Sequence, residues 1–304
     1  MSRALVWSLD GRDWPNRESS RFVLAGGVRW HVQIMGKGPI VLLIHGAASS
    51  SHTWRDLAPM LAREFTVVAP DLPGHAFSSS PASKQHTITA TAAAMGALLE
   101  AVELPPRVVA GHSAGAAAAV RLILDGHAAP QSLVCMNGAL LPPAGLPGQF
   151  FSPTARLLSG NPLLASLFAR RAVRPGFVEG LLARTGSVLD EQGVALYRRL
   201  AGNATHVRAV LAMMAHWDLR RLSRELTRVQ CAVRLLHGER DGMIPQAQFR
   251  HLERTWPDAG SVVLGGLGHL AHEEAPGRVT AEIRQAAVAA GVLRKRQADA
   301  CPPG

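Results

Sequence analysis

Lysine, cysteine and tyrosine are scarce in this sequence of 304 residues, which contains three, three and one of them respectively. The cysteines, Cys135, Cys231 and Cys301, form no CxxC pair and are odd in number. This argues against a disulfide framework and a zinc ribbon, and it indicates a reducing compartment. Because lysine is rare, the net charge of +10 comes almost entirely from arginine.

Targeting and cofactor signals are missing as well. Residues 1–20 carry both charge signs and no apolar core of signal-peptide length. Residues 128–155 are uncharged but hold five prolines, which a lipid-exposed helix does not accommodate. No GxGxxG, Walker A or HExxH motif occurs, so we expect neither cofactor nor metal. Basic residues are not interleaved with aromatic ones, so nucleic acid is not an expected partner. We therefore predict a cytoplasmic protein.

Apolar runs of strand length alternate with helical stretches. Val28–Met35 alternates in polarity, whereas Ile40–Ile44 is continuously apolar, as is typical of a strand buried on both faces. Similar runs occupy 67–69, 107–110, 132–136, 232–236 and 261–264, and helical patterns occupy 52–63, 87–102, 114–124, 245–255 and 276–290. This succession predicts an α/β fold with a mostly parallel central sheet covered by helices on both faces.

The alternation is interrupted between residues 139 and 224, which contain no clear strand pattern. We interpret this stretch as a helical cap inserted into a core made of residues 1–138 and 225–290, with an N-terminal arm over about residues 1–20. The cap carries a net charge of +7. Residues 291–304 are polar and end in prolines, and are expected to form a disordered tail.

The strongest chemical signal is the GHSAG motif at Gly111–Gly115, between a predicted strand and an alanine-rich helix. A serine on such a sharp turn needs small neighbours on both sides, and Gly111 and Gly115 meet this need. Ser113 is therefore the candidate nucleophile. The helix that follows would direct free amides and a positive dipole end toward a developing oxyanion.

A serine hydroxyl needs a base, and the base needs an acid that orients it. The candidate acid is Asp241, in the HGERDGMIP segment that follows a predicted strand. The alternative is that Asp241 only caps a helix near Pro245. Glu239 and Asp218 are the rival acids.

The candidate base is His269, which follows the last predicted strand in a glycine-rich loop, GGLGH. His272 is the rival, although it falls toward the following helix. Two amides are expected to form the oxyanion hole, those of Ala114, directly after the serine, and Ala47, in the His45–Ala48 segment.

The strings LLIHG, DLPGH, GHSAG, HGERDGMIP and GLGH, in this order, resemble the α/β-hydrolase superfamily, whose triad has the chain order Ser113, Asp241, His269. Four further strings resemble the BchO-type magnesium chelatase accessory proteins of bacteriochlorophyll synthesis: RDWPNRESSRFV, NGALLPPAG, FFSPTARLLSGNPLL and LAMMAHWDL. This resemblance spans roughly residues 10–290. One departure is Ala76, where the superfamily often has glycine.

The resemblance implies a serine-dependent hydrolase of an ester-type bond, acting in or assisting magnesium-tetrapyrrole synthesis near the chelatase step. A non-catalytic porphyrin-binding or chelatase assembly factor and a general carboxylesterase are the alternatives. A small apolar or tetrapyrrole-like substrate would contact Phe151, Met213 and Trp217. Magnesium chelatase subunits are possible partners. The cap arginines could meet substrate carboxylates or an anionic membrane, which would place the protein peripherally at the inner or photosynthetic membrane.

Overall fold

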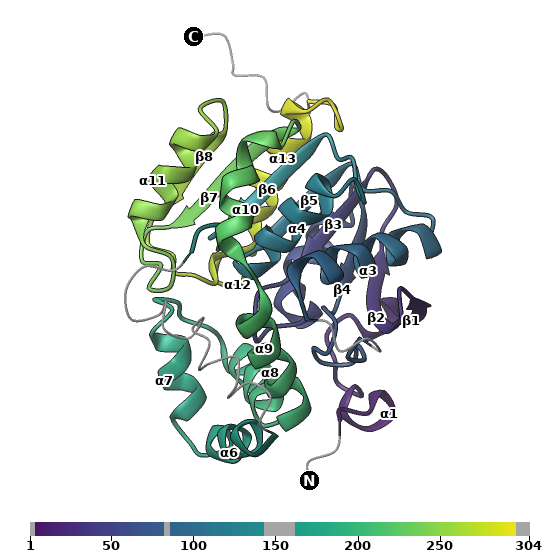
Figure 1. Ribbon diagram of the computed structural model, residues 1–304, viewed down its shortest axis with the longest axis vertical. Helices are drawn as coiled ribbons and strands as arrows, with labels where there is room; N and C mark the ends of the chain where they lie inside the picture. Colours follow the sequence, from purple (N-terminus) through teal and green to yellow (C-terminus); the bar gives the residue numbers. More distant parts are fainter. Residues whose placement is uncertain (1–3, 82–85, 143–161, 296–304) are drawn as a thin grey trace.

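One eight-stranded sheet runs through the computed structural model, which describes residues 4–81, 86–142 and 162–295 (Figure 1). Its strand order is β1-β2-β4-β3-β5-β6-β7-β8. The two pairings at one edge of the sheet, β1 with β2 and β2 with β4, are antiparallel, and all others are parallel. The strands are β1 (Ser20–Ala25), β2 (Val28–Met35), β3 (Ile40–Ile44), β4 (Thr66–Pro70), β5 (Val108–His112), β6 (Ser132–Met136), β7 (Ala232–Gly238) and β8 (Gly260–Leu264). The predicted mostly parallel sheet is confirmed.

Two local predictions were incomplete. Strand β1 was not expected, because it lies at the sheet edge with every residue at least partly exposed, which leaves no apolar run to detect. The helix expected over 52–63 is divided into a 3-10 turn, η2 (Ser51–Trp54), and a short helix, α2 (Leu57–Leu61). The amide of Ser51 donates to the buried carboxylate of Asp71 at 2.7 Å, and this contact ties the turn to the end of β4.

Helices cover both faces of the sheet because successive strand residues point to opposite sides. Leu42 and Ile44 pack in one core cluster, and Val41 and Leu43 pack in the other. The first cluster is covered by α3 (Ile88–Ala101), α4 (Ala114–Leu124), α10 (Leu219–Glu225) and α11 (Gln246–Thr255), and the second by α2 and α13 (Pro276–Ala289).

The described part of the proposed cap is helical. Helices α6 (Pro162–Ala172), α7 (Phe177–Ala183), α8 (Glu191–Ala201) and α9 (Ala204–His216) gather at one end of the molecule (Figure 1). The next helix, α10, instead packs on the core, where Glu225 pairs with Arg121 of α4. Within the described ranges, no helix combines the length and apolar character needed to cross a membrane. The expected tail lies outside the described residues from 296 onward.

Candidate active site

Ser113 lies at the sharp turn between β5 and α4. Its backbone angles, φ 52° and ψ −119°, fall in a region that side-chain-bearing residues rarely adopt. A Cβ added at Gly115 would lie 2.1 Å from the carbonyl oxygen of Ile44, and one at Gly111 would lie 2.5 Å from the carbonyl oxygen of Gly115. Only glycine therefore allows the turn to pack against β3. The serine itself remains partly exposed.

The structure brings Asp241 and His269 together. Asp241, in the turn after β7, accepts a hydrogen bond from His269 Nδ1 at 2.9 Å through Oδ2. Its other oxygen, Oδ1, accepts the amides of Met243 and Ile244 at 2.7 and 2.9 Å. Both side chains are largely buried. This pairing holds Nδ1 as the donor, so Nε2 is left as the nitrogen able to accept a proton.

The rival residues have other partners. Glu239 accepts the amide of Gly266, and Asp218 caps the N-terminus of α10. His272 bonds through Nε2 to the Thr53 hydroxyl at 2.6 Å. None of these three contacts involves the Asp241–His269 pair.

The turn of Ser113 and the loop of His269 are adjacent. His112, which directly precedes the serine, donates from Nε2 to the carbonyl oxygen of His269 at 2.9 Å, and the two rings lie 4.7 Å apart. Asn137 also contacts this carbonyl, at 2.6 Å. The same Asn137 side chain donates to the Gly268 oxygen and accepts the Gly238 amide. It therefore connects the ends of β6 and β7 to the loop that carries His269.

Two amides close to the serine have no hydrogen-bond acceptor among the described residues. Ala114 is the first residue of α4, and Ala47 lies in the loop after β3. No described residue accepts a hydrogen bond from either amide. The two segments are close, since a Cβ added at Gly46 would lie 3.1 Å from Ser113 Cβ. The next residue, Ala48, takes a positive φ of 60°, which bends the loop here.

Two further histidines, His112 and His272, lie near His269. The ring of His112 lies 4.3 Å from that of His272, which in turn lies 4.6 Å from the ring of Trp54 at a tilt of 43°. Burial, reinforced by neighbouring histidines, lowers the pKa of both His112 and His272 well below the usual value. They are therefore neutral near pH 7 and add no positive charge beside His269. Among the described residues, no group of His, Cys, Asp or Glu is arranged to hold a metal ion.

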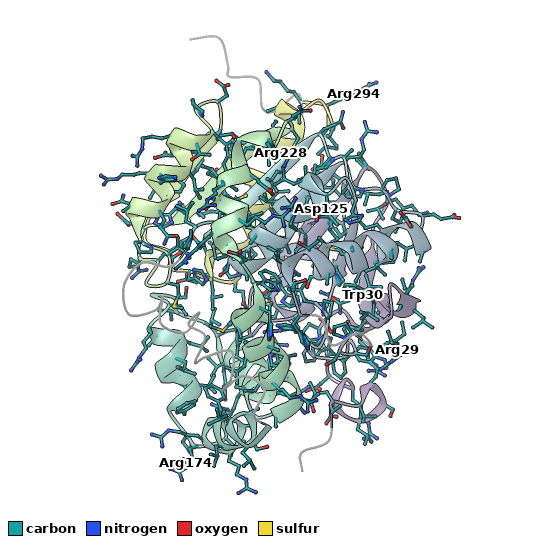
Figure 2. The ribbon with its side chains drawn as sticks, in the orientation of Figure 1. Arg29, Trp30, Asp125, Arg174, Arg228 and Arg294 are labelled. Atoms are coloured by element: carbon teal, nitrogen blue, oxygen red, sulfur yellow. The ribbon has the colours of Figure 1, made fainter. Side chains whose placement is uncertain are left out.

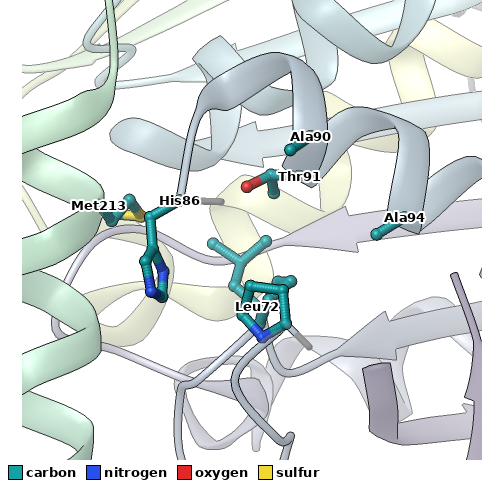
Figure 3. Close-up of a pocket in the computed structure, with 8 residues that line it drawn as sticks. Leu72, His86, Ala90, Thr91, Ala94 and Met213 are labelled. Carbon is teal, nitrogen blue, oxygen red and sulfur yellow. The ribbon is translucent and has the colours of Figure 1, made fainter. Parts of the chain in front are cut away.

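Two of the three residues expected to contact substrate are described, and they lie in different surroundings. Trp217 is buried in the core cluster that includes α10. Met213, on α9, lines a small cavity of about 20 Å³ with Leu72 and His86 (Figure 3), which has room for about one water molecule. Phe151 lies outside the described residues.

Sequence reasoning missed Asn137 and the cap segment at residues 184–188, both of which contact the loop of His269. Asn137 had one usable signal, since an Asn-Gly pair directly follows a buried strand, and the structure gives it a φ of 47°. The cap segment acts mainly through backbone groups, which leave no motif.

Comparison with known proteins gives concordant results. The model of the alpha/beta hydrolase family matches residues 41–283. The magnesium-chelatase 30 kDa subunit of Rhodobacter capsulatus is 36% identical over 265 residues, covering 86% of this chain and 92% of that protein. A solved alpha/beta hydrolase fold protein from Burkholderia ambifaria has a TM-score of 0.74 at 24% identity, covering 94% of this chain and 100% of that one. An esterase from Thermogutta terrifontis has a TM-score of 0.68 at 24% identity, covering 87% and 97%.

Proposed function

The chain belongs to the alpha/beta hydrolase family, and we propose that it is a serine hydrolase that cleaves an ester-type bond. The observation that carries this proposal is the hydrogen-bonded Asp241–His269 pair, located beside a serine on a strained turn. The amides of Ala47 and Ala114, for which no described residue is an acceptor, lie in segments close to the serine and add support.

In the proposed reaction, Ser113 Oγ attacks the substrate carbonyl carbon while His269 Nε2 takes its proton. Asp241 keeps the imidazole in the required tautomer and stabilises its positive charge. The Ala47 and Ala114 amides stabilise the oxyanion. His269 then protonates the leaving alcohol, and an acyl group remains on Ser113. Water, activated by the same histidine, releases the acid and regenerates the serine.

The first test is labelling with a fluorophosphonate probe, followed by turnover of p-nitrophenyl esters. We expect labelling at Ser113 and a kcat about 10⁴–10⁶-fold lower in Ser113→Ala, because a triad acts as a unit. Thr87→Ala is a suitable control, since the exposed Thr87 side chain caps the N-terminus of α3. Absence of labelling in the folded wild-type protein would contradict the proposal.

The identity to a protein named as a magnesium-chelatase subunit favours a role in magnesium-tetrapyrrole synthesis. We propose that the hydrolase acts in or assists bacteriochlorophyll synthesis near the chelatase step, on a tetrapyrrole-like or small apolar ester. The same identity supports a second candidate, a porphyrin-binding or chelatase assembly factor without turnover. A general carboxylesterase is the third.

These candidates differ in their dependence on Ser113. If chemistry is required, Ser113→Ala abolishes the pathway role in cells that lack the wild-type protein, while porphyrin binding and capture of chelatase subunits persist. If the variant restores pigment synthesis fully, the assembly role is supported instead. Ester turnover with no effect of deletion on pigment synthesis would support the general carboxylesterase.

We also propose that the cap contacts an anionic membrane surface through α6 and α7. Six of the eleven exposed large apolar side chains of the described chain lie within residues 163–188, including Leu167 and Val173 at 60% and 62% exposure. Three exposed arginines accompany them, Arg170, Arg171 and Arg174, and Figure 2 shows Arg174 at the cap end of the molecule. Apolar and arginine side chains together favour an anionic lipid surface.

Vesicle flotation tests this contact. We expect binding to phosphatidylcholine vesicles only when phosphatidylglycerol is present. Replacing the three α6–α7 arginines by glutamine should abolish binding. The matched control replaces Arg220, Arg221 and Arg224 of α10, an equal charge change away from this surface. Equal loss in both triple variants would contradict a localised site.

A further inference from the structure

The connection between α7 and α8 crosses from the cap to the loops that carry the acid and the base. Resting on the proposed function, we propose that this connection, residues 184–188, is a positioning element for the reaction. We name it the cap strap. It holds the turn of Asp241 and the loop of His269 in register, so that the cap completes the geometry of the triad as well as covering the site.

A single carbonyl group of the cap strap contacts both catalytic loops. The oxygen of Thr185 accepts the amide of His269 at 3.0 Å and the amide of Gly242 at 3.2 Å. The first amide belongs to the proposed base, and the second to the residue directly after the proposed acid. Displacement of Thr185 would therefore move the backbone at both residues of the Asp241–His269 hydrogen bond.

Two side-chain contacts fix the strap along the base loop. The hydroxyl of Ser187, itself buried, accepts the amide of Leu270 at 2.8 Å. The carboxylate of Glu274 accepts the amides of Val188 and Gly268 at 3.1 and 2.7 Å. These bonds hold Gly268 and Leu270, the two residues that flank His269 in the chain. The imidazole is consequently held by its backbone as well as by Asp241.

The strap also packs directly against the backbone of the acid turn and of the base loop. Gly186 has a φ of 75°, and a Cβ placed on it would lie 1.8 Å from the carbonyl oxygen of Arg240, in the acid turn. A Cβ on Gly242 would lie 2.2 Å from the Arg184 oxygen, and one on Gly268 would lie 2.4 Å from Ser187 Oγ. A glycine on each of the three segments allows them to meet without intervening side chains.

A buried polar network anchors the following cap helix to the same region. Tyr197 of α8 donates to Glu273 at 2.7 Å, and Arg55 pairs with Glu273 and, at 3.0 Å, with Asp190 at the start of α8. Glu273 lies in α12 (Ala271–Glu274), immediately after the base loop. The strap is thus held at its C-terminal end, which limits how far it can move relative to His269.

This arrangement has a kinetic consequence. Hydrolysis needs Ser113, His269 and Asp241 aligned at once, and displacement by about 1 Å can reduce a rate by about 10²-fold. Loosening the strap should therefore lower kcat more than it raises KM, because binding of a small ester does not depend on the alignment of the base.

Two glycines of the cap provide a matched test. Gly186→Ala places a methyl group against the acid turn, whereas Gly176→Ala imposes a similar positive φ, 78°, and no atom of the described residues lies within 4 Å of the new methyl. With p-nitrophenyl acetate we expect kcat to fall about 100-fold in Gly186→Ala with KM changed less than about threefold. Gly176→Ala should stay within about twofold of wild type for both.

Three further variants test the strap even if Gly186→Ala does not fold. Ser187→Ala removes one acceptor, and kcat should fall about threefold to tenfold. Ser187→Cys, whose sulfur accepts hydrogen bonds weakly, should fall between Ser187→Ala and wild type. Ser223→Ala, which alters an exposed hydroxyl of α10, should not change kcat. Hydrogen–deuterium exchange should be faster in Ser187→Ala for peptides that contain Gly242 and Leu270.

The outcomes separate the strap from the proposed function. Wild-type kcat and exchange in Ser187→Ala, or equal loss of kcat in Gly186→Ala and Gly176→Ala, would overturn the positioning role. If the wild-type protein neither reacts with the probe nor hydrolyses esters, the proposed function fails, and the exchange comparison still decides whether the strap holds the two loops.

Discussion

Buried histidines should make this protein sensitive to mild acid, and His206 of α9 allows the effect to be measured. His206 accepts the amide of Ala76 at 3.1 Å through Nδ1 and is 2% exposed. Burial lowers its pKa from 6.5 to about 4. Below about pH 6.5 the unfolded chain therefore binds a proton that the folded protein does not, and stability falls as the pH decreases.

The expected magnitude follows from the two pKa values. Between about pH 7 and pH 5, His206 alone should reduce the free energy of unfolding by about 2 kcal/mol. Burial also lowers the pKa of seven other histidines, so the total slope is steeper: these are His45, His52, His75, His86, His112, His237 and His272. The pKa of the buried Asp71 carboxyl is lowered by His31, although burial opposes this shift. The stability that Asp71 contributes is therefore lost only when the pH falls below about 3.8, the ordinary pKa of aspartate.

Urea unfolding at several pH values between about 5 and 7 measures this slope for wild type, His206→Asn and His251→Asn. Asparagine keeps an acceptor for the Ala76 amide but does not titrate. The slope of the unfolding free energy against pH reports the number of protons taken up on unfolding. This number should be lower by about one in His206→Asn and the same as wild type in His251→Asn, where the replaced side chain is exposed on α11. An unchanged slope in His206→Asn would refute the claim that burial keeps His206 neutral.

Ala76→Gly should raise the free energy of unfolding by about 1 kcal/mol, measured in urea, because Ala76 has a φ of 40° that glycine adopts without strain. Glu273→Gln should lower it by about 3 kcal/mol, because Arg55 then loses its buried carboxylate; a loss below 1 kcal/mol would show that Asp190 suffices. Asn137→Ala should lower kcat by at least about tenfold on p-nitrophenyl acetate, because the Asn137 side chain bonds both the Gly238 amide and the His269 carbonyl; an unchanged kcat would exclude a positioning role.

The fold was largely predictable because a buried parallel strand has a distinctive composition. Ile40–Ile44 and Ser132–Met136 are apolar at nearly every position, since both faces of the sheet are covered, and the structure has these two strands with the same bounds. β1 lacks this signal because its two faces are partly exposed. The resemblance to the magnesium chelatase accessory proteins is confirmed by the Rhodobacter capsulatus relative.

The candidate site was predictable where local chain geometry dictates residue type. The turn at Ser113 requires small neighbours, so it leaves a readable motif. Asp241 and His269 were predictable from their positions after strands, and in the structure His269 Nδ1 lies 2.9 Å from Asp241 Oδ2. Asn137 and Ser187 contact backbone groups distant in sequence through side-chain hydrogen bonds, and such contacts produce no periodicity or spacing in the sequence.

The cap strap also limits how freely the inserted cap could be exchanged for another. Its contacts to the acid turn and base loop use backbone amides of Gly242 and His269, which any sequence supplies, but they require close approach at Gly186. A foreign cap with a side chain there would push the acid turn away even if its helices packed well. A cap segment that shaped only the substrate pocket would not face this constraint. The insertion and the core loops must therefore change together, because the proposed triad depends on both.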